Sequence, residues 1–338
     1  AMTHTGAPLI QYEIALQLRN RYGIEPVVFC PEAGPLVNYY REHGIEPIIG
    51  PLFFQNVHTG RATYQQMIEQ VAQIFRDAEV DAVYANTMLT FWANVAAERA
   101  GLASIWNIHE SEGINHYVGT MGAALAREAA ASFALPYRVV FGSRATMRLY
   151  EKLETRHNFT YQHNSVDTQR IAEWQGSWTR EEARKALKVA PGEMMLLIVG
   201  TVCARKGQLD LVQAYERLPY VLQKQVRCFL VGDVPNEYSQ RVADTIARWP
   251  DYMKERFTVV RETGQVGRYY RAADVFVCTS RVECFPRVNL EAMYMGLPLV
   301  TTPVFGVPEQ DLRPQALVHR QKRIAGQGLP LVAWRPPQ

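Results

Sequence analysis

Glu283 and Glu291, two acids separated by seven residues, are the residues whose types and spacing point most directly to ligand chemistry. The apolar run 275–278 predicts a short β-strand before them, and a helix is expected to begin near Val288. A second apolar strand at 299–302 completes a strand–loop–helix–strand unit of an α/β sheet. Such sheets bind ligands beyond the carboxyl ends of their strands, where Glu283 lies. Glu291, expected in the first helical turn, could accept hydrogen bonds from a vicinal diol.

On spacing alone, the ligand-binding interpretation is matched by a simpler one, in which Glu283 is a solvated acid of the loop and Glu291 is an acid at the start of the helix. A resemblance separates these interpretations, because E-C-F-P-R-V-N-L-E-A-M-Y-M-G-L-P-L-V is similar to the E-x7-E signature of glycosyltransferase family 4, and G-V-P-E follows it. The resemblance implies that Glu283 contacts the hydroxyls of a donor sugar and that Glu291 contacts the ribose of its nucleotide. It also assigns the intervening residues Cys284, Phe285, Pro286, Arg287 and Val288 to the donor. Pro286 stands where the family usually has glycine, so one backbone N–H that would face the sugar is absent.

The composition is that of a globular protein large enough for two domains. The chain has 338 residues, of which 48% are hydrophobic and 20% charged, and its formal net charge is +3. So small a charge gives no basis for nucleic-acid binding, and no apolar run approaches the ~20 residues of a membrane span. The amino-terminal residues lack the basic and apolar regions of a signal peptide. We therefore expect a cytoplasmic protein, with peripheral association with the inner face of the membrane left open.

The cysteines and histidines give no sign of a disulfide framework or a metal site. Five cysteines without C-x-x-C pairs indicate reduced thiols: Cys30, Cys203, Cys228, Cys278 and Cys284. Cys284 lies between Glu283 and Phe285, but a nucleophilic role would need a base partner that the sequence does not offer. No pair of histidines has metal-ligand spacing, so no metal is expected.

The amino-terminal half alternates strands with helices, which is the pattern of a mostly parallel sheet covered on both faces. T-G-A-P resembles the glycine-containing loop of the family's first domain, so Gly6 is expected to let the backbone approach the donor. In the family a strand precedes this loop, and we therefore expect residues before Ala1. His109 lies past the strand that ends at Ile108 and resembles the histidine of the family's H-D or H-E loop, which reaches the donor sugar. A lone histidine here would instead be interpreted as half-buried and bonded to backbone.

A loop with two basic residues, Arg205 and Lys206, joins an apolar strand to an amphipathic helix. Cations at a helix amino end can bind phosphate, although an exposed basic turn has the same pattern. By resemblance, G-x5-K-G is the family's diphosphate-binding loop, which places Gly200 and Thr201 at the donor and Lys206 on its phosphates. Family members often carry arginine where Thr201 stands, and we expect Arg205 to substitute for it. Thr263, in a loop that resembles the one flanking the nucleotide base, is assigned to the base.

The resemblance covers residues 5–310 and implies an α/β protein of the GT-B fold, with two Rossmann-like β/α/β domains facing across a cleft. The H-N-S-V-D segment at 163–167 resembles the family's N-G-V-D element at the domain junction. Residues 1–167 are therefore expected to form an acceptor-binding domain that lacks its first strand. Residues 168–338 are expected to form a donor-binding domain that lacks the closing helix after Glu309.

Together these assignments imply a retaining, hexosyltransferase-like glycosyltransferase that needs no metal. A nucleotide-sugar, a UDP- or GDP-sugar, would be the co-substrate without any further cofactor, and the acceptor would be a glycan, a lipid-linked molecule or a small molecule. Glu283 and His109 would hold the sugar, while Lys206 and Arg205 would stabilise the charge of the departing diphosphate. Two alternatives share the fold: a catalytically weak or inactive nucleotide-sugar-binding protein, and a phosphorylase or epimerase.

Overall fold

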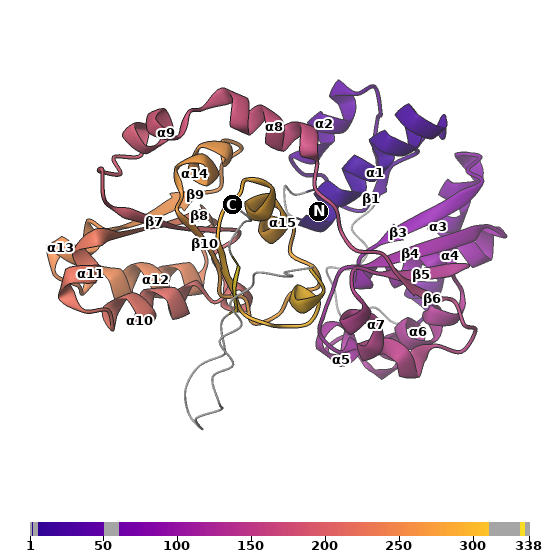
Figure 1. Ribbon diagram of the computed structural model, residues 1–338. Coiled ribbons are helices and arrows are strands. Elements are labelled where there is room, and N and C mark those ends of the chain that lie inside the picture. The colour runs from indigo at the N-terminus through magenta and orange to yellow at the C-terminus, as the bar shows by residue number, and fades with distance from the viewer. Residues whose placement is uncertain (1, 3–5, 51–60, 311–331, 335–338) are drawn as a thin grey trace. The chain divides into compact units, whose positions relative to one another are not determined.

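A computed structural model describes residues 2, 6–50, 61–310 and 332–334 (Figure 1). The chain separates into two compact units, Ala1–His163 and Asn164–Gln338. The boundary expected after residue 167 lies just inside the second unit. Each unit is built around a parallel or mostly parallel sheet with helices, so the α/β class expected from the alternating pattern is confirmed.

The first unit contains a four-stranded parallel sheet in the order β3-β4-β5-β6 and a separate parallel pair of strands. The sheet strands are β3 (Ala82–Asn86), β4 (Ala103–Ile108), β5 (Arg138–Phe141) and β6 (Phe159–Tyr161), and the pair is β1 (Phe29–Cys30) and β2 (Ile48–Ile49). The helices are α1 (Gly6–Tyr22), α2 (Leu36–Glu42), α3 (Arg61–Asp77), α4 (Phe91–Ala100), α5 (Ile114–Val118), α6 (Ala123–Ala131) and α7 (Arg144–Tyr150). β1 and β2 have two residues each, and Pro47, directly before β2, has no N–H with which to extend the ladder.

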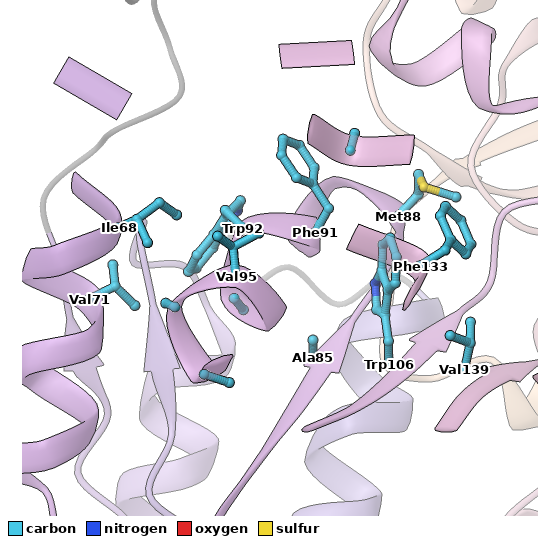
Figure 2. Packing of buried hydrophobic residues seen from close by; sticks show 14 of the residues in the cluster. Ile68, Val71, Ala85, Met88, Phe91, Trp92, Val95, Trp106, Phe133 and Val139 are labelled. Atoms are coloured by element: carbon cyan, nitrogen blue, oxygen red, sulfur yellow. The ribbon is translucent and has the colours of Figure 1, made fainter. Parts of the chain in front are cut away.

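The core of the first unit joins α3, α4 and the four-stranded sheet. Ile68 and Val71 on α3 pack with Trp92 and Val95 on α4, and all four side chains are buried (Figure 2). These residues recur every three or four positions, which places them on one face of each helix. Trp106 of β4 is fully buried in the same cluster. This packing holds β4 in place, and His109 is the first residue after that strand.

The second unit contains a six-stranded sheet in the order β12-β11-β10-β7-β8-β9, parallel except for β12. Its strands are β7 (Met194–Val199), β8 (Val226–Asp233), β9 (Phe257–Arg261), β10 (Val275–Cys278), β11 (Leu299–Thr301) and β12 (Val332–Trp334). The helices are α8 (Thr168–Ser177), α9 (Arg180–Ala186), α10 (Gln208–Glu216), α11 (Tyr220–Gln225), α12 (Glu237–Ala247), α13 (Asp251–Lys254), α14 (Gly267–Ala272) and α15 (Arg287–Tyr294).

Both faces of this second sheet are covered. Successive residues of a strand point to opposite faces, and on β8 they enter two different hydrophobic clusters. Phe229 and Val231 join one cluster, whereas Cys228 and Leu230 join the other. Burial on both faces explains why the strands are continuously apolar rather than alternating.

The strand order creates a topological switch point between β7 and β10. The chain runs from β7 outward through β8 and β9, and then returns to the other side of β7 at β10. Parallel strands end at the same edge of the sheet, and ligands of open α/β sheets bind where the strand order reverses. The loop 200–207 follows β7 and the loop 279–286 follows β10. The loops that carry Lys206 and Glu283 therefore both lie at the switch point.

Candidate functional site

Three of the predicted catalytic residues meet at this switch point. Lys206 Nζ donates a hydrogen bond to Glu283 Oε1, and Ser280 Oγ donates to the same oxygen over 2.8 Å. Arg205 Nη1 lies 3.4 Å from that oxygen and donates to the carbonyl oxygen of Val282 over 3.0 Å. The cluster thus places two cations and a hydroxyl around one carboxylate. Ser280 is absent from the sequence-based assignment, although it lies in the same loop, three residues before Glu283.

Backbone contacts join the two loops that carry the cluster. Thr279 Oγ1 donates to the carbonyl oxygen of Lys206 over 3.0 Å, and Arg281 N donates to the carbonyl oxygen of Arg205 over 2.8 Å. Gly207, which has a φ of +67°, also lies close to the second loop. A Cβ atom at Gly207 would lie 2.4 Å from the carbonyl oxygen of Thr279. Glycine is therefore required both for the left-handed backbone and for the close approach.

Gly207→Ala is expected to lower the free energy of unfolding by about 2 kcal/mol, because alanine is strained at positive φ and its Cβ has no room. Urea unfolding of the two proteins measures the difference. Gly264→Ala is the matched control, since a Cβ at Gly264 would meet nothing within 4 Å and its φ lies outside the left-handed region. Equal losses in the two variants would show that the loop contact at Gly207 is not tight.

Glu283 is held as a carboxylate in a buried position. Only 7% of the residue is exposed, and this burial raises the pKa of its carboxyl. The charges of Lys206 and Arg205, with the hydrogen bonds from Lys206 and Ser280, act in the opposite direction and leave the pKa of Glu283 below its ordinary value. The Lys206 side chain is 16% exposed and that of Arg205 is 47% exposed. Lys206 is thus the fixed cation of the cluster, and Arg205 is the one that faces solvent.

The lowered pKa of Glu283 predicts how stability depends on pH. A carboxyl whose pKa is lower in the folded than in the unfolded chain stabilises the fold fully above the unfolded value, about 4.5. This contribution is lost as the pH falls below 4.5 through the folded-state pKa. The difference in unfolding free energy between the wild type and Glu283→Gln should therefore shrink between pH 6 and pH 3. A difference that stays constant over this range would contradict the ion pair.

Glu291 lies one residue further into its helix than the sequence-based assignment had it. α15 begins at Arg287, one residue earlier than expected, so Glu291 is its fifth residue and lies outside the first turn. In the described part of the chain, no side-chain capping hydrogen bond is present at the amino end of α15. Instead, Tyr270 Oη donates to Glu291 Oε2 over 2.8 Å, and Arg170 Nη2 lies 3.4 Å from Oε1. The expectation of a first-turn acid was wrong, and packing with α8 and α14 sets the direction of this carboxylate.

Two backbone carbonyl groups of the segment between the two glutamates accept hydrogen bonds from side chains elsewhere in the unit. The carbonyl oxygen of Phe285 accepts from Asn164 Nδ2 over 3.1 Å, and that of Pro286 accepts from Gln310 Nε2 over 2.7 Å. The side chains of Cys284 and Phe285 are buried, while Arg287 and Val288 open α15. Asn164 and Gln310 were not predicted as contributors. Each lies in a motif that the sequence analysis singled out, Asn164 in H-N-S-V-D and Gln310 directly after G-V-P-E.

The other predicted donor residues of the second unit lie in loops at the ends of their strands. Gly200 follows β7 with a φ of +139°, and its N–H donates to the carbonyl oxygen of Val231. A Cβ there would lie 3.7 Å from Lys206 Cε, so Gly200 borders the cluster. The carbonyl oxygen of Thr201 accepts from Gln208 Nε2 over 2.9 Å. Thr263 lies in the loop after β9, where its hydroxyl accepts from the N–H of Gln265 over 3.1 Å.

In the first unit, a second polar group contains His109 and the start of α1. His109 Nε2 lies 2.9 Å from Asn86 Oδ1 and 3.0 Å from Asn107 Nδ2. Asn86 Nδ2 donates to the carbonyl oxygen of Ala7 over 3.0 Å, so Asn86 joins the first turn of α1, which begins at Gly6, to His109. The structure thus brings His109 close to the start of α1, where Gly6 is the first residue rather than part of a described loop. Asn86, the last residue of β3, was not assigned from the sequence.

In the part of the chain that the structure describes, metal-binding clusters, disulfides and membrane-spanning helices are absent. No three His, Cys, Asp or Glu side chains gather closely enough to bind a metal ion. The five cysteines, all within the described ranges, are free thiols. No described helix combines the length and the hydropathy that a membrane crossing requires.

Two family descriptions match consecutive parts of the chain. "Glycosyltransferase Family 4" matches residues 6–170 and "Glycosyl transferases group 1" matches residues 179–310. The chain is 25% identical to the "Putative teichuronic acid biosynthesis glycosyltransferase TuaC" of Bacillus subtilis, over 92% of this chain and 80% of that protein. It is 33% identical to the alpha-maltose-1-phosphate synthase of Mycobacterium tuberculosis, over 36% of this chain and 32% of that protein.

Solved structures share the fold over most of the chain. Anabaena HepE in complex with UDP-glucose has a TM-score of 0.71 at 21% identity, covering 91% of this chain and 80% of that chain. WaaG, a glycosyltransferase involved in lipopolysaccharide biosynthesis, has a TM-score of 0.64 at 18% identity, covering 90% of this chain and 80% of that chain. At these identities the likeness establishes the fold alone, and it confirms the expected GT-B fold.

Proposed function

Since the chain belongs to glycosyltransferase family 4, we propose that it moves a sugar from a nucleotide-sugar donor to a saccharide acceptor and retains the anomeric configuration. The single observation that carries this proposal is the cluster of Lys206, Arg205 and Glu283 at the switch point of the second sheet. Its cations offer charge-assisted hydrogen bonds to a diphosphate. Its carboxylate oxygens can accept hydrogen bonds from sugar hydroxyls.

The proposed role of Lys206 and Arg205 is to stabilise the negative charge of the leaving group. When the bond between the anomeric carbon and the phosphate oxygen breaks, negative charge grows on the departing nucleoside diphosphate. Lys206 and Arg205 would stabilise that charge more strongly in the transition state than in the ground state, which is what accelerates a reaction. We infer that these two cations serve the purpose that a divalent metal serves elsewhere, and we propose a metal-independent reaction.

The donor and the acceptor are inferred from the relatives. Anabaena HepE was solved with UDP and with UDP-glucose, which supports a UDP-hexose as the first donor to test and a GDP-sugar as the second. The names of the TuaC and WaaG proteins concern teichuronic acid and lipopolysaccharide, which supports a glycan acceptor in polysaccharide assembly. A lipid-linked acceptor and peripheral association with the membrane stay predictions.

A thermal-shift screen across UDP-, GDP- and ADP-sugars tests the proposal. A ligand present at a hundred times its Kd stabilises the folded protein by about 2.7 kcal/mol, so the cognate nucleotide-sugar should raise the Tm measurably. The protein should then release free nucleoside diphosphate from that donor, slowly with water and faster with an acceptor. Free glucose and inorganic phosphate are the controls. Stabilisation without any release of nucleoside diphosphate would instead identify a binding protein.

A further inference from the structure

The carboxylate of Glu291 is held at both oxygens by residues that lie outside the E-x7-E segment. Only 7% of Glu291 is exposed. Tyr270 on α14 donates to Oε2 over 2.8 Å, while Arg170 on α8 lies 3.4 Å from Oε1. The 2.8 Å contact comes from Tyr270, a fully buried and neutral side chain. The 3.4 Å contact comes from Arg170, whose side chain is 34% exposed. Tyr270 therefore provides the firmer of the two contacts.

The position of the Tyr270 hydroxyl is fixed by a stack of three aromatic rings. Trp174 on α8 and Tyr270 have ring centroids 5.7 Å apart and planes 9° apart. On the other side, Tyr270 and Phe276 of β10 have centroids 5.6 Å apart and planes 15° apart. A Cβ at Gly267 would lie 2.5 Å from the Trp174 ring, so glycine lets α14 pack closely on α8. The ring of Tyr270 is thus clamped between an indole and the sheet.

The hydroxyl of Tyr270 is also fixed as a hydrogen-bond donor. Burial raises the pKa of Tyr270 well above its ordinary value, and the charge of Glu291 and the hydrogen bond to it raise this pKa further. A neutral phenol facing a carboxylate can only donate. The proton therefore stays on Tyr270 and points to Glu291 Oε2.

We propose that Tyr270 is a positioning residue, which orients the carboxylate of Glu291 so that it can accept both hydroxyls of a nucleotide's ribose. This inference rests on the proposed function and extends it to a residue that touches no donor itself. A vicinal diol binds a carboxylate best when each hydroxyl donates to one oxygen, which requires a defined carboxylate plane. The hydrogen bond from Tyr270 sets that plane and leaves a second lone pair of Oε2 for the diol.

Tyr270→Phe tests the proposal, because it removes one oxygen atom and keeps the ring in the aromatic stack. Isothermal titration calorimetry would measure the Kd of UDP and of 2′,3′-dideoxy-UDP, with GDP and its dideoxy analogue as the second pair. The wild type should prefer the ribonucleotide. Tyr270→Phe should lower this preference about tenfold while the Kd of the dideoxy analogue stays unchanged. A role limited to stability would leave the ratio of the two Kd values as it is in the wild type.

Two further variants separate the possible failures. Tyr215→Phe is the matched control, since Tyr215 is equally buried and its hydroxyl donates to the carbonyl oxygen of Gln223 in a different hydrophobic cluster; it should keep the full preference for ribose. Glu291→Gln should lose that preference. If none of UDP, GDP and ADP binds, or if Glu291→Gln keeps the preference, the ribose assignment of the proposed function is overturned and this inference with it. If Glu291→Gln loses the preference and Tyr270→Phe retains it, this inference alone is overturned.

Discussion

Lys206→Met is expected to lower the turnover number about a thousandfold and to weaken donor binding tenfold or less. Removal of one preorganised group that faces developing charge typically costs 10²–10³ in turnover, and a full positive charge lies at the upper end of that range. Lys206 is the fixed cation of the cluster, since it is mostly buried and hydrogen-bonded to Glu283. Its charge is needed most when the bond to the diphosphate breaks, so the loss should appear in kcat rather than in KM. Steady-state kinetics with the donor found in the screen measures both constants.

The control for Lys206→Met must account for the buried carboxylate that it leaves behind. Without Lys206, Glu283 loses its main partner, and a buried charge without its partner destabilises a protein by several kcal/mol. The double variant Lys206→Met/Glu283→Gln should regain most of the lost stability and none of the lost turnover. Lys254→Met is the remote control, because Lys254 pairs with Asp251 on the exposed side of α13 and should leave kcat unchanged. A thousandfold rise in KM with an unaltered kcat would assign Lys206 to ground-state binding only.

The elements that carry the cluster were predictable from local sequence. The apolar runs 194–199 and 275–278 predicted β7 and β10, and the basic residues before Gly207 predicted a loop that enters a helix. The capping box of Thr179 and Glu182, another local pattern, is present at the start of α9. The meeting of Lys206 with Glu283 needed one further step, since the two residues are 77 positions apart. The shared edge of a parallel sheet supplies that step.

The environment of Glu291 could not be predicted in the same way. Arg170 is 121 positions away, on a helix that the sequence analysis did not separate from the domain junction, and no motif connects the two residues. The aromatic stack of Trp174, Tyr270 and Phe276 arises from the packing of α8 and α14 onto the sheet. A periodic apolar pattern marks the buried face of a segment, but it does not identify the distant segment against which that face packs. The contacts of this acid therefore became visible only in the folded chain.

Glu283→Gln is expected to lower turnover about a hundredfold and to tighten the binding of free nucleoside diphosphate. The amide keeps the size of the carboxylate and can still accept the hydrogen bond from Ser280, but it removes the negative charge. Lys206 and Arg205 then face the diphosphate without a competing carboxylate, so the product should bind more tightly. Turnover falls because a neutral amide accepts hydrogen bonds from sugar hydroxyls more weakly than a carboxylate does. Steady-state kinetics and calorimetry with UDP or GDP measure the two effects.

Slower turnover combined with tighter diphosphate binding distinguishes this role of Glu283 from general damage to the site, which would weaken both. Arg205 is half-exposed, so part of the tightening should disappear between 50 mM and 500 mM salt, where surface charges are screened. Ser280→Ala is the matched control, because it removes a hydrogen bond to the same oxygen and keeps the charge. That variant should lose less than tenfold in turnover and should bind the diphosphate as the wild type does. If Glu283→Gln instead weakens diphosphate binding as Lys206→Met does, the carboxylate supports the cations rather than competing with the phosphates for them.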